Sequence, residues 1–317
     1  GGNIATNDGG PRCLKYGVTS DYVLGLEVVL ADGSIVRLGS RTHKNKTGFD
    51  FVRFFTGSEG LLGVVTEATL KLLPLPPFSA ALSIGFGSIT AAAKGIDLIF
   101  RAGFLPSALE IADEFTLKAA TQRTGSDRLS GCCGHLIVEL DGQERSVRGE
   151  IRDVKKLLAR LKPRFVDQAF GKQAVESIWQ LRREFSYSLR DTGLVKLNQD
   201  IVVPRGRLIE LLEFADRLQK KHSMPVACFG HAGDGNIHVN VMLDDAKSGR
   251  MKFRNAALDE LFRWVVKSGG VITGEHGIGI ARKPWWSLAT SPEVRKLHRS
   301  VKQALDPKRI LNPGKFL

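Results

Sequence analysis

The sequence predicts an α+β protein with two domains, and three features carry that prediction. Residues 1–75 are rich in short strand patterns, a proline-rich stretch follows at 74–77, and strands then alternate with amphipathic helices over residues 76–317. The length of 317 residues fits two domains of ordinary size. Hydrophobic residues make up 43% and charged residues 25% of the chain, which is typical of globular proteins and excludes disordered and fibrous classes.

The first domain is expected to begin with paired strands. Apolar runs at 22–30 and 35–38 flank an Asp-Gly pair at 32–33, a strong signal for a β-hairpin. A β-branched, alternating stretch at 64–72 predicts a third strand. The glycine-rich segment 56–63 before it indicates either turns or a close approach to a ligand, and it lacks the lysine of a phosphate-binding loop.

The second domain shows apolar runs of strand length between stretches with helical periodicity. Strands are expected at 80–85 and at 135–140, and helices at 89–102, 146–161, 174–189 and 207–222. Strands with helices packed on one face favour an α+β domain.

Composition and charge indicate which kinds of partner and which cellular setting to expect. The net charge is +13, but the densest basic run, 155–164, has apolar residues at helical spacing and is interpreted as a solvated helix face. We therefore expect no nucleic-acid partner. No apolar stretch reaches the length of a membrane-spanning helix, so no transmembrane segment is expected. The four cysteines, without metal-binding spacing or a secretory signal, predict a reduced, cytoplasmic setting.

The segment 229–241 is the most informative for chemistry. Residues 233–236 are expected to form a tight turn, because Gly, Asp and Asn accept positive φ. The strand that follows alternates, with apolar residues on one face and His238 and Asn240 on the other. The chain reversal would bring His231 back beside His238, and two imidazoles on a rigid turn predict a metal pair.

A second glycine-flanked segment, 274–279, carries Glu275 and His276. Glu275 would complete a His, His, carboxylate site for Zn²⁺ or Mn²⁺ with His231 and His238. His276 would then serve as general base. A metallohydrolase that uses the same three ligands and a bound water is an alternative. The remaining histidines are interpreted as structural: His43, His135, His222 and His298.

Taken together, these motifs resemble the FAD-dependent D-2-hydroxyacid oxidoreductases of the vanillyl-alcohol-oxidase-like flavoproteins, which include glycolate oxidase FAD-linked subunits and D-lactate dehydrogenases. The resemblance extends from residues 1–7 and 10–17, through 57–60, to 312–315. It implies that residues 1–75 are the second subdomain of an FAD domain and that residues 76–317 form a ferredoxin-like α+β cap domain. It also implies an N-terminally truncated chain, so an inactive fragment is a further alternative.

The resemblance implies FAD as cofactor. Glycines would allow backbone to approach the flat ring, and amide groups could bond its pyrimidine edge. The residues implied to line the cofactor cleft are Gly2, Asn3, Thr6, Gly9, Gly10, Gly57, Glu59, Gly60, Gly63, Val65 and Asn312.

The resemblance also implies the reaction, which is oxidation of a small D-2-hydroxy acid, glycolate or D-lactate, by hydride transfer to flavin. His231, His238 and Glu275 would hold a divalent metal, and His276 would be the base. The residues implied to bind substrate are Arg182, Ser186, Lys196 and Asn240. Electrons would pass to a partner subunit or a quinone, which makes peripheral association with the inner membrane an alternative to a purely cytoplasmic location.

Overall fold

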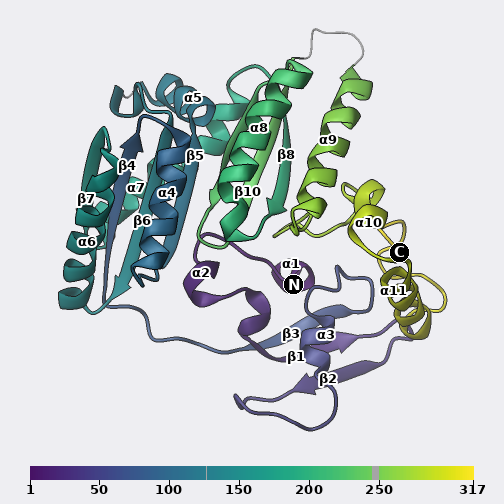
Figure 1. Ribbon diagram of the computed structural model, residues 1–317. Coiled ribbons are helices and arrows are strands. Elements are labelled where there is room, and N and C mark those ends of the chain that lie inside the picture. The colour runs from purple at the N-terminus through teal and green to yellow at the C-terminus, as the bar shows by residue number, and fades with distance from the viewer. Residues whose placement is uncertain (126, 245–249) are drawn as a thin grey trace. The chain divides into compact units, whose positions relative to one another are not determined.

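The computed structural model describes residues 1–125, 127–244 and 250–317, and the side chains of 250–254 are not described. The chain forms two compact units, shown in Figure 1. Unit 1 comprises residues 1–10, 17–74 and 272–317, and unit 2 comprises residues 11–16 and 75–271. Residues 272–317 thus belong to the same compact unit as the first part of the chain. The boundary that the sequence predicts at 75/76 instead assigns them to the second domain.

Unit 1 is built on a three-stranded antiparallel sheet in the order β2-β1-β3. β1 is Val23–Val29, β2 is Ile35–Gly39 and β3 is Val64–Leu70, so all three expected strands of this unit are confirmed. The hairpin between β1 and β2 turns at Gly33, whose φ of +85° favours glycine. The helices of this unit are α1 (Gly2–Thr6), α3 (Phe51–Phe55), α10 (Lys283–Ala289) and α11 (Pro292–Leu305), and η1 is Thr19–Asp21.

A buried lysine explains why the C-terminal residues belong to unit 1. Lys302 on α11 is only 6% exposed, and its Nζ lies 2.7 Å from the carbonyl oxygen of Leu61 and 2.8 Å from that of Leu311. The same ammonium group forms an ion pair with the buried carboxylate of Asp306 at 2.5 Å. One desolvated cation with three acceptors therefore fastens α11 to the glycine-rich segment 56–63.

Unit 2 contains a seven-stranded, fully antiparallel sheet in the order β7-β4-β6-β5-β9-β10-β8. Its strands are β4 (Phe78–Phe86), β5 (Ala108–Asp113), β6 (Gly134–Gly142), β7 (Phe165–Phe170), β8 (Val195–Val202), β9 (Val226–His231) and β10 (Asn236–Leu243). Its helices are α2 (Cys13–Tyr16), α4 (Ile89–Arg101), α5 (Glu114–Thr124), α6 (Glu144–Leu158), α7 (Lys172–Arg190), α8 (Leu208–His222) and α9 (Arg250–Lys267), with short turns η2 (Asp127–Leu129), η3 (Ala159–Leu161) and η4 (Arg205–Arg207).

The sheet consists of two related halves. The first half runs β4-α4-β5-β6-α6-β7, with α5 and η2 inserted between β5 and β6. Its strand order is β7-β4-β6-β5, which is the ferredoxin-like arrangement. The second half repeats the path as β8-α8-β9-β10-α9, with the order β9-β10-β8. The halves meet where β5 pairs with β9, and the expected ferredoxin-like α+β domain is confirmed.

The two faces of this sheet differ in chemistry. Helices α4, α6 and α8 cover one face, where Leu82, Ile111 and Leu136 are fully buried. Helices α5 and α7 cover the other face, so helices pack on both faces and not on one as expected. On this second face the strands carry polar side chains at alternate positions. The polar members of that face, all at most 9% exposed, are Ser83, Glu110, His135, Glu139, Asp200, His231, Asn236, His238 and Asn240. These polar side chains add nothing to the apolar core, so their gathering on one buried face indicates a functional site.

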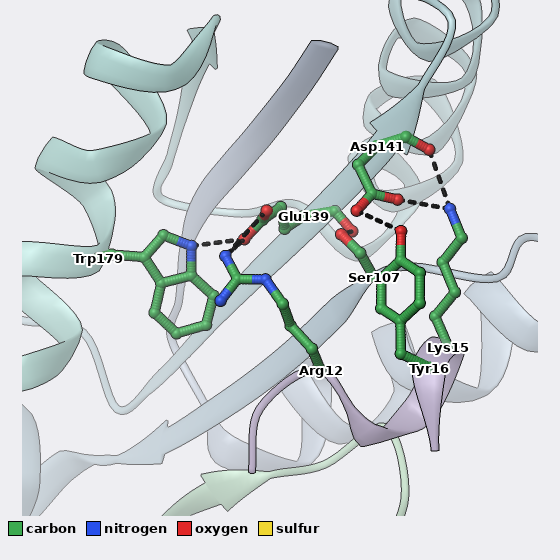
Figure 2. A network of polar contacts seen from close by, with 7 residues as sticks. All are labelled: Arg12, Lys15, Tyr16, Ser107, Glu139, Asp141 and Trp179. Atoms are coloured by element: carbon green, nitrogen blue, oxygen red, sulfur yellow. Dashed lines mark hydrogen bonds and ion pairs between the residues drawn. The ribbon is translucent and has the colours of Figure 1, made fainter. Parts of the chain in front are cut away.

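Figure 2 shows how α2 is held on this polar face. Arg12 donates to the buried carboxylate of Glu139 at 3.0 Å, and the indole Nε1 of Trp179 donates to the same carboxylate at 2.5 Å. Lys15 and Tyr16 both donate hydrogen bonds to the carboxylate of Asp141. Asp141 follows Glu139 by two residues on β6 and therefore lies on the same face of the sheet. These contacts explain why residues 11–16 belong to unit 2 although the residues on either side of them belong to unit 1.

Some elements were not expected from the sequence. β5, α5, β7, β8 and β9 are absent from the prediction. The expected helix over 146–161 ends as an α-helix at Leu158 and continues as the 3-10 turn η3. Lys162, whose φ is +50°, ends that turn directly before Pro163. Within the residues described here, no helix is long and apolar enough to cross a membrane.

Candidate functional site

The structure brings His231 and His238 together on the polar face of unit 2. His231 lies directly opposite Asn236 across β9 and β10, so His238, two residues along β10, projects from the same face. The two ring centroids are 5.5 Å apart at an interplanar angle of 82°. The tight turn between the strands is confirmed, and Gly235 is required in it because a Cβ would lie 2.1 Å from the Val203 carbonyl oxygen.

Glu110 on β5 joins two of the expected site residues, and sequence analysis missed it. Its Oε1 lies 2.6 Å from Nδ1 of His231, and its Oε2 accepts a hydrogen bond from Nε of Arg182 at 2.6 Å. Burial alone would raise the pKa of this carboxyl, but the charges of His231 and Arg182 outweigh burial and lower it to about 2. A lone carboxylate inside the apolar run Ala108–Ala112 is the signal that could have revealed it.

The expected substrate-binding residues lie on α7, β8 and β10. Arg182 is 8% exposed, and Ser186 follows it by one helical turn on the same helix. Nζ of Lys196 donates to Oγ of Ser186 at 2.7 Å, and burial, together with the charge of Arg190, lowers the pKa of Lys196. Asn240 is fully buried, and within the described residues its Oδ1 makes no hydrogen bond.

His135 lies on the same face but has a structural environment, as expected. Its Nε2 is 2.8 Å from Oγ of Ser83, and it is 1% exposed. Burial and, to a smaller extent, the charge of Arg182 together lower its pKa to about 3. A histidine this reluctant to accept a proton is unsuited to act as a general base near neutral pH.

His135 should make the stability of unit 2 pH-dependent. Because its pKa is lowered in the folded state, its contribution is present above pH 6.5 and is lost as the pH falls toward 3. Between pH 7 and pH 5 we expect a loss of about 2 kcal/mol in the free energy of unfolding. Urea denaturation at the two pH values should show this loss, and the His135→Asn variant should show a smaller one. Equal losses in both proteins would contradict the assignment.

In unit 1 the expected cofactor residues gather around the loop 57–60. The backbone N–H of Gly57 donates to the Ile4 carbonyl at 2.8 Å, and that of Glu59 donates to the Ala5 carbonyl at 2.7 Å, so the loop lies against α1. Nδ2 of Asn312 donates to the Glu59 carbonyl at 2.5 Å. α1 carries Gly2, Asn3 and Thr6, while Gly9 and Gly10 lie in the irregular stretch that follows it. Contact of all these residues with FAD stays a prediction.

Two of the expected cofactor residues have packing roles that explain them without a ligand. A Cβ on Gly63 would lie 2.4 Å from Cγ1 of Val28, so glycine is required for β3 to pack on β1. Val65 is paired with Val28 in the sheet.

Glu59 also holds the loop that carries Glu275 and His276. Its carboxylate accepts hydrogen bonds from the backbone N–H groups of Ile278 and Gly279, both at 2.7 Å. Gly277 has a φ of +72°, and a Cβ there would lie 2.7 Å from Oε1 of Glu59. All of these residues belong to unit 1, and the placement of Glu275 beside the two histidines of unit 2 stays a prediction.

Replacing Glu59 with alanine should therefore loosen the 275–279 loop. The two backbone donors would lose their acceptor, and we expect kcat in the full-length protein to fall by about 10-fold or more, as misplacement of a catalytic group does. FAD content, measured by absorbance after gel filtration, should remain near that of the wild type. If FAD is lost while the rate per bound FAD is unchanged, Glu59 acts on the cofactor and the loop account is wrong.

The chain was compared with known proteins, and two family models match it. The model for FAD linked oxidases, C-terminal domain, matches residues 75–316, and the model for an FAD binding domain matches residues 1–39. The chain belongs to the FAD-linked oxidase family. The expected family and the expected cofactor FAD are thereby confirmed, and the chain is a member of a family of FAD-linked oxidoreductases.

Two curated relatives match across this family member's whole length. It is 35% identical over 316 residues to glycolate oxidase subunit GlcD of Bacillus subtilis, covering 100% of this chain and 67% of the relative. It is 31% identical over 324 residues to D-lactate dehydrogenase of Anaerostipes hadrus, covering 100% of this chain and 68% of the relative. The chain thus spans about two thirds of the length of these relatives.

A solved structure shows the same fold. The FAD-linked oxidase chain superposes on p-cresol methylhydroxylase, solved with substrate bound, with a TM-score of 0.69 at 19% identity, covering 93% of this chain and 65% of the other. This match confirms the vanillyl-alcohol-oxidase-type fold and carries no statement about substrate.

Proposed function

We propose that the full-length protein oxidises a small D-2-hydroxy acid, glycolate or D-lactate, to the 2-oxo acid with FAD and a divalent cation. The observation that carries this proposal is the buried cluster on the polar face of unit 2, where Glu110 contacts His231 and Arg182 and where His238 lies beside His231. Family membership supports the redox class, and the similarity to glycolate oxidase subunit GlcD and to D-lactate dehydrogenase supports the substrate class.

The chain offers suitable groups to hold a 2-hydroxy acid. The guanidinium of Arg182 binds the substrate carboxylate, because its planar donors match the two carboxylate oxygens. Lys196, linked to Ser186, adds a positive charge for the substrate carboxylate. Asn240 faces the same side of the sheet as both histidines, and the buried Oδ1 of its side chain can accept a hydrogen bond.

The donor set on the polar face fits a divalent cation. Two imidazoles on neighbouring strands are suitable ligands for Zn²⁺ or Mn²⁺, and Glu275 is the proposed third ligand. When bound, the cation polarises the 2-hydroxyl of the substrate and lowers its pKa.

His276 is the proposed base in this reaction. It accepts the 2-hydroxyl proton while the hydride leaves C2, so a C–H bond and an O–H bond break as the C2–O double bond forms. FAD, when bound, would accept the hydride and thereby both electrons. Glu59 keeps His276 in place through the backbone of the 275–279 loop.

A dye-coupled assay tests the proposed function. The purified full-length protein, reconstituted with FAD and Mn²⁺ or Zn²⁺, is given glycolate, D-lactate or L-lactate with an artificial electron acceptor. We expect dye reduction and an equivalent amount of 2-oxo acid with glycolate or D-lactate, and little with L-lactate. Hydrolytic products without dye reduction would instead indicate a metallohydrolase, and no turnover of any 2-hydroxy acid would contradict the proposal.

Two further parts of the proposal concern the cellular setting. Electrons pass from reduced FAD to a partner subunit or to a quinone, consistent with the word "subunit" in the name of one relative. The proposed location is the cytoplasm, with peripheral contact at the inner membrane if quinone is the acceptor.

A further inference from the structure

We propose that Glu110 is a positioning residue that sets the tautomer of His231 and the orientation of Arg182, so that one buried carboxylate prepares both the metal ligand and the substrate anchor. This inference rests on the proposed function, because it assigns Glu110 a role toward the proposed cation and substrate.

The position of Glu110 in the sheet is the first argument. The two halves of unit 2 meet at β5 and β9, and there Glu110 is directly opposite His231. The two residues point to the same face, and their side chains are joined at 2.6 Å between Oε1 and Nδ1. This pairing is built into the strand register, so it does not depend on a mobile loop.

The tautomer of His231 follows from this contact. An ionised carboxylate can only accept hydrogen bonds, so neutral His231 must carry its proton on Nδ1. The lone pair is then on Nε2, which is the atom that would bind the cation. A carboxylate behind a metal-binding histidine also fixes the ring orientation and raises the basicity of the ligating nitrogen.

Arg182 is oriented by the other oxygen of the same carboxylate. Its Nε donates to Oε2 of Glu110 at 2.6 Å, and its guanidinium lies 4.8 Å from the ring centroid of Phe229. With Nε engaged and one face of the guanidinium against an aromatic ring, the two terminal amino groups are the donors that can meet a carboxylate. Glu110 therefore orients the group that binds substrate as well as the group that binds metal.

Glu139 provides a matched comparison on the same face of the sheet. It is also almost fully buried, at 3% exposed, and it also accepts from an arginine, Arg12. Its second partner is the indole of Trp179 and not a histidine. A purely structural role for buried carboxylates on this face would make the two residues equivalent, whereas a positioning role distinguishes them.

The experiment measures cation binding by the full-length protein and two variants, Glu110→Gln and Glu139→Gln. Each metal-free protein is titrated calorimetrically with Zn²⁺ and with Mn²⁺, and circular dichroism and Tm report folding. We expect Glu110→Gln to weaken cation binding by about 10- to 100-fold and to raise KM for D-lactate. Glu139→Gln should lower Tm without a change in cation affinity.

The outcomes separate this inference from the proposed function. Wild-type affinity in a folded Glu110→Gln protein would overturn the inference and leave the proposed metal site standing. Equal losses in both variants would also overturn it, because they would indicate a general structural effect. A wild-type protein that binds neither cation would overturn the proposed metal site and the inference together.

A measurement on the wild type decides the question if Glu110→Gln does not fold. Histidine-selective ¹⁵N NMR of the metal-free protein above pH 8 reports which ring nitrogen carries the proton, and His231→Gln assigns the signal. A proton on Nδ1 of His231 is the expected result. A proton on Nε2 would contradict the inference.

Discussion

Replacing His276 with glutamine in the FAD-loaded, full-length protein is expected to lower kcat for D-2-hydroxy acid oxidation by about 10²- to 10⁴-fold, the usual contribution of a general base. Glutamine retains hydrogen bonding but cannot accept the 2-hydroxyl proton. Cation content and FAD content should be unchanged, because His276 is assigned to neither ligand set. Stopped-flow kinetics with D-lactate, together with metal analysis of the same sample, would measure both.

The matched control for this experiment is His298→Gln. His298 is also in unit 1, where its ring packs 5.7 Å from that of Trp286, and it has no proposed part in the reaction. We expect a small change in Tm and a near-normal kcat. Near-normal kcat in His276→Gln would remove that residue as the base, and a comparable loss in His298→Gln would mean that the assay reports unit 1 stability.

Replacing His238 with alanine should remove the bound cation and with it about three orders of magnitude in turnover, because the cation supplies several kcal/mol of charge stabilisation. His238 lies beside His231 on a strand that is buried along its whole length, so the loss of one imidazole is not easily repaired by movement of another side chain. Metal analysis by mass spectrometry and the dye-coupled rate measure the two consequences.

The control for His238 is His222→Ala at the end of α8. His222 lies 2.9 Å from the carboxylate of Glu260 and is outside the polar face that holds the site. This variant should keep its cation and its rate. A His238→Ala protein that retained one cation per chain and turned over normally would show that the histidine pair is not a metal site.

Much of the fold could be predicted from the sequence because the relevant patterns are local. The hairpin at Gly33 and the turn at Gly235 depend on positive φ, which the residue type itself reveals. The position of His231 and His238 on the same face of the sheet follows from strand alternation on either side of that second turn. These inferences need only neighbouring residues and the pleat of a strand.

The missed elements are those whose stability comes from distant contacts. β5 is only six residues long and carries Glu110 inside an apolar run, so it gives no clean alternating pattern. Its carboxylate is tolerated because Arg182 and His231, both more than 70 positions away in sequence, satisfy it. The grouping of residues 272–317 with unit 1 depends in the same way on Lys302 and Glu59.

The residues of the candidate site also divide into those that local sequence patterns indicate and those that only distant contacts reveal. Residue types and glycine flanks indicated His231, His238, Glu275 and His276, whereas the groups that hold them in place were not visible in the sequence. Glu110 acts through a cross-strand pair, and Glu59 acts through backbone N–H groups that carry no residue-specific signal. Such supporting contacts require the fold to be known.

The most direct test of the whole account is a single-turnover experiment under anaerobic conditions. The full-length protein with bound FAD is mixed with D-lactate or glycolate, with and without a divalent cation, and flavin absorbance near its visible maximum is followed. The account predicts rapid, stoichiometric bleaching that requires the cation and does not occur with L-lactate. Flavin that stays oxidised with every D-2-hydroxy acid, or that is reduced equally fast after the cation is stripped, would contradict it.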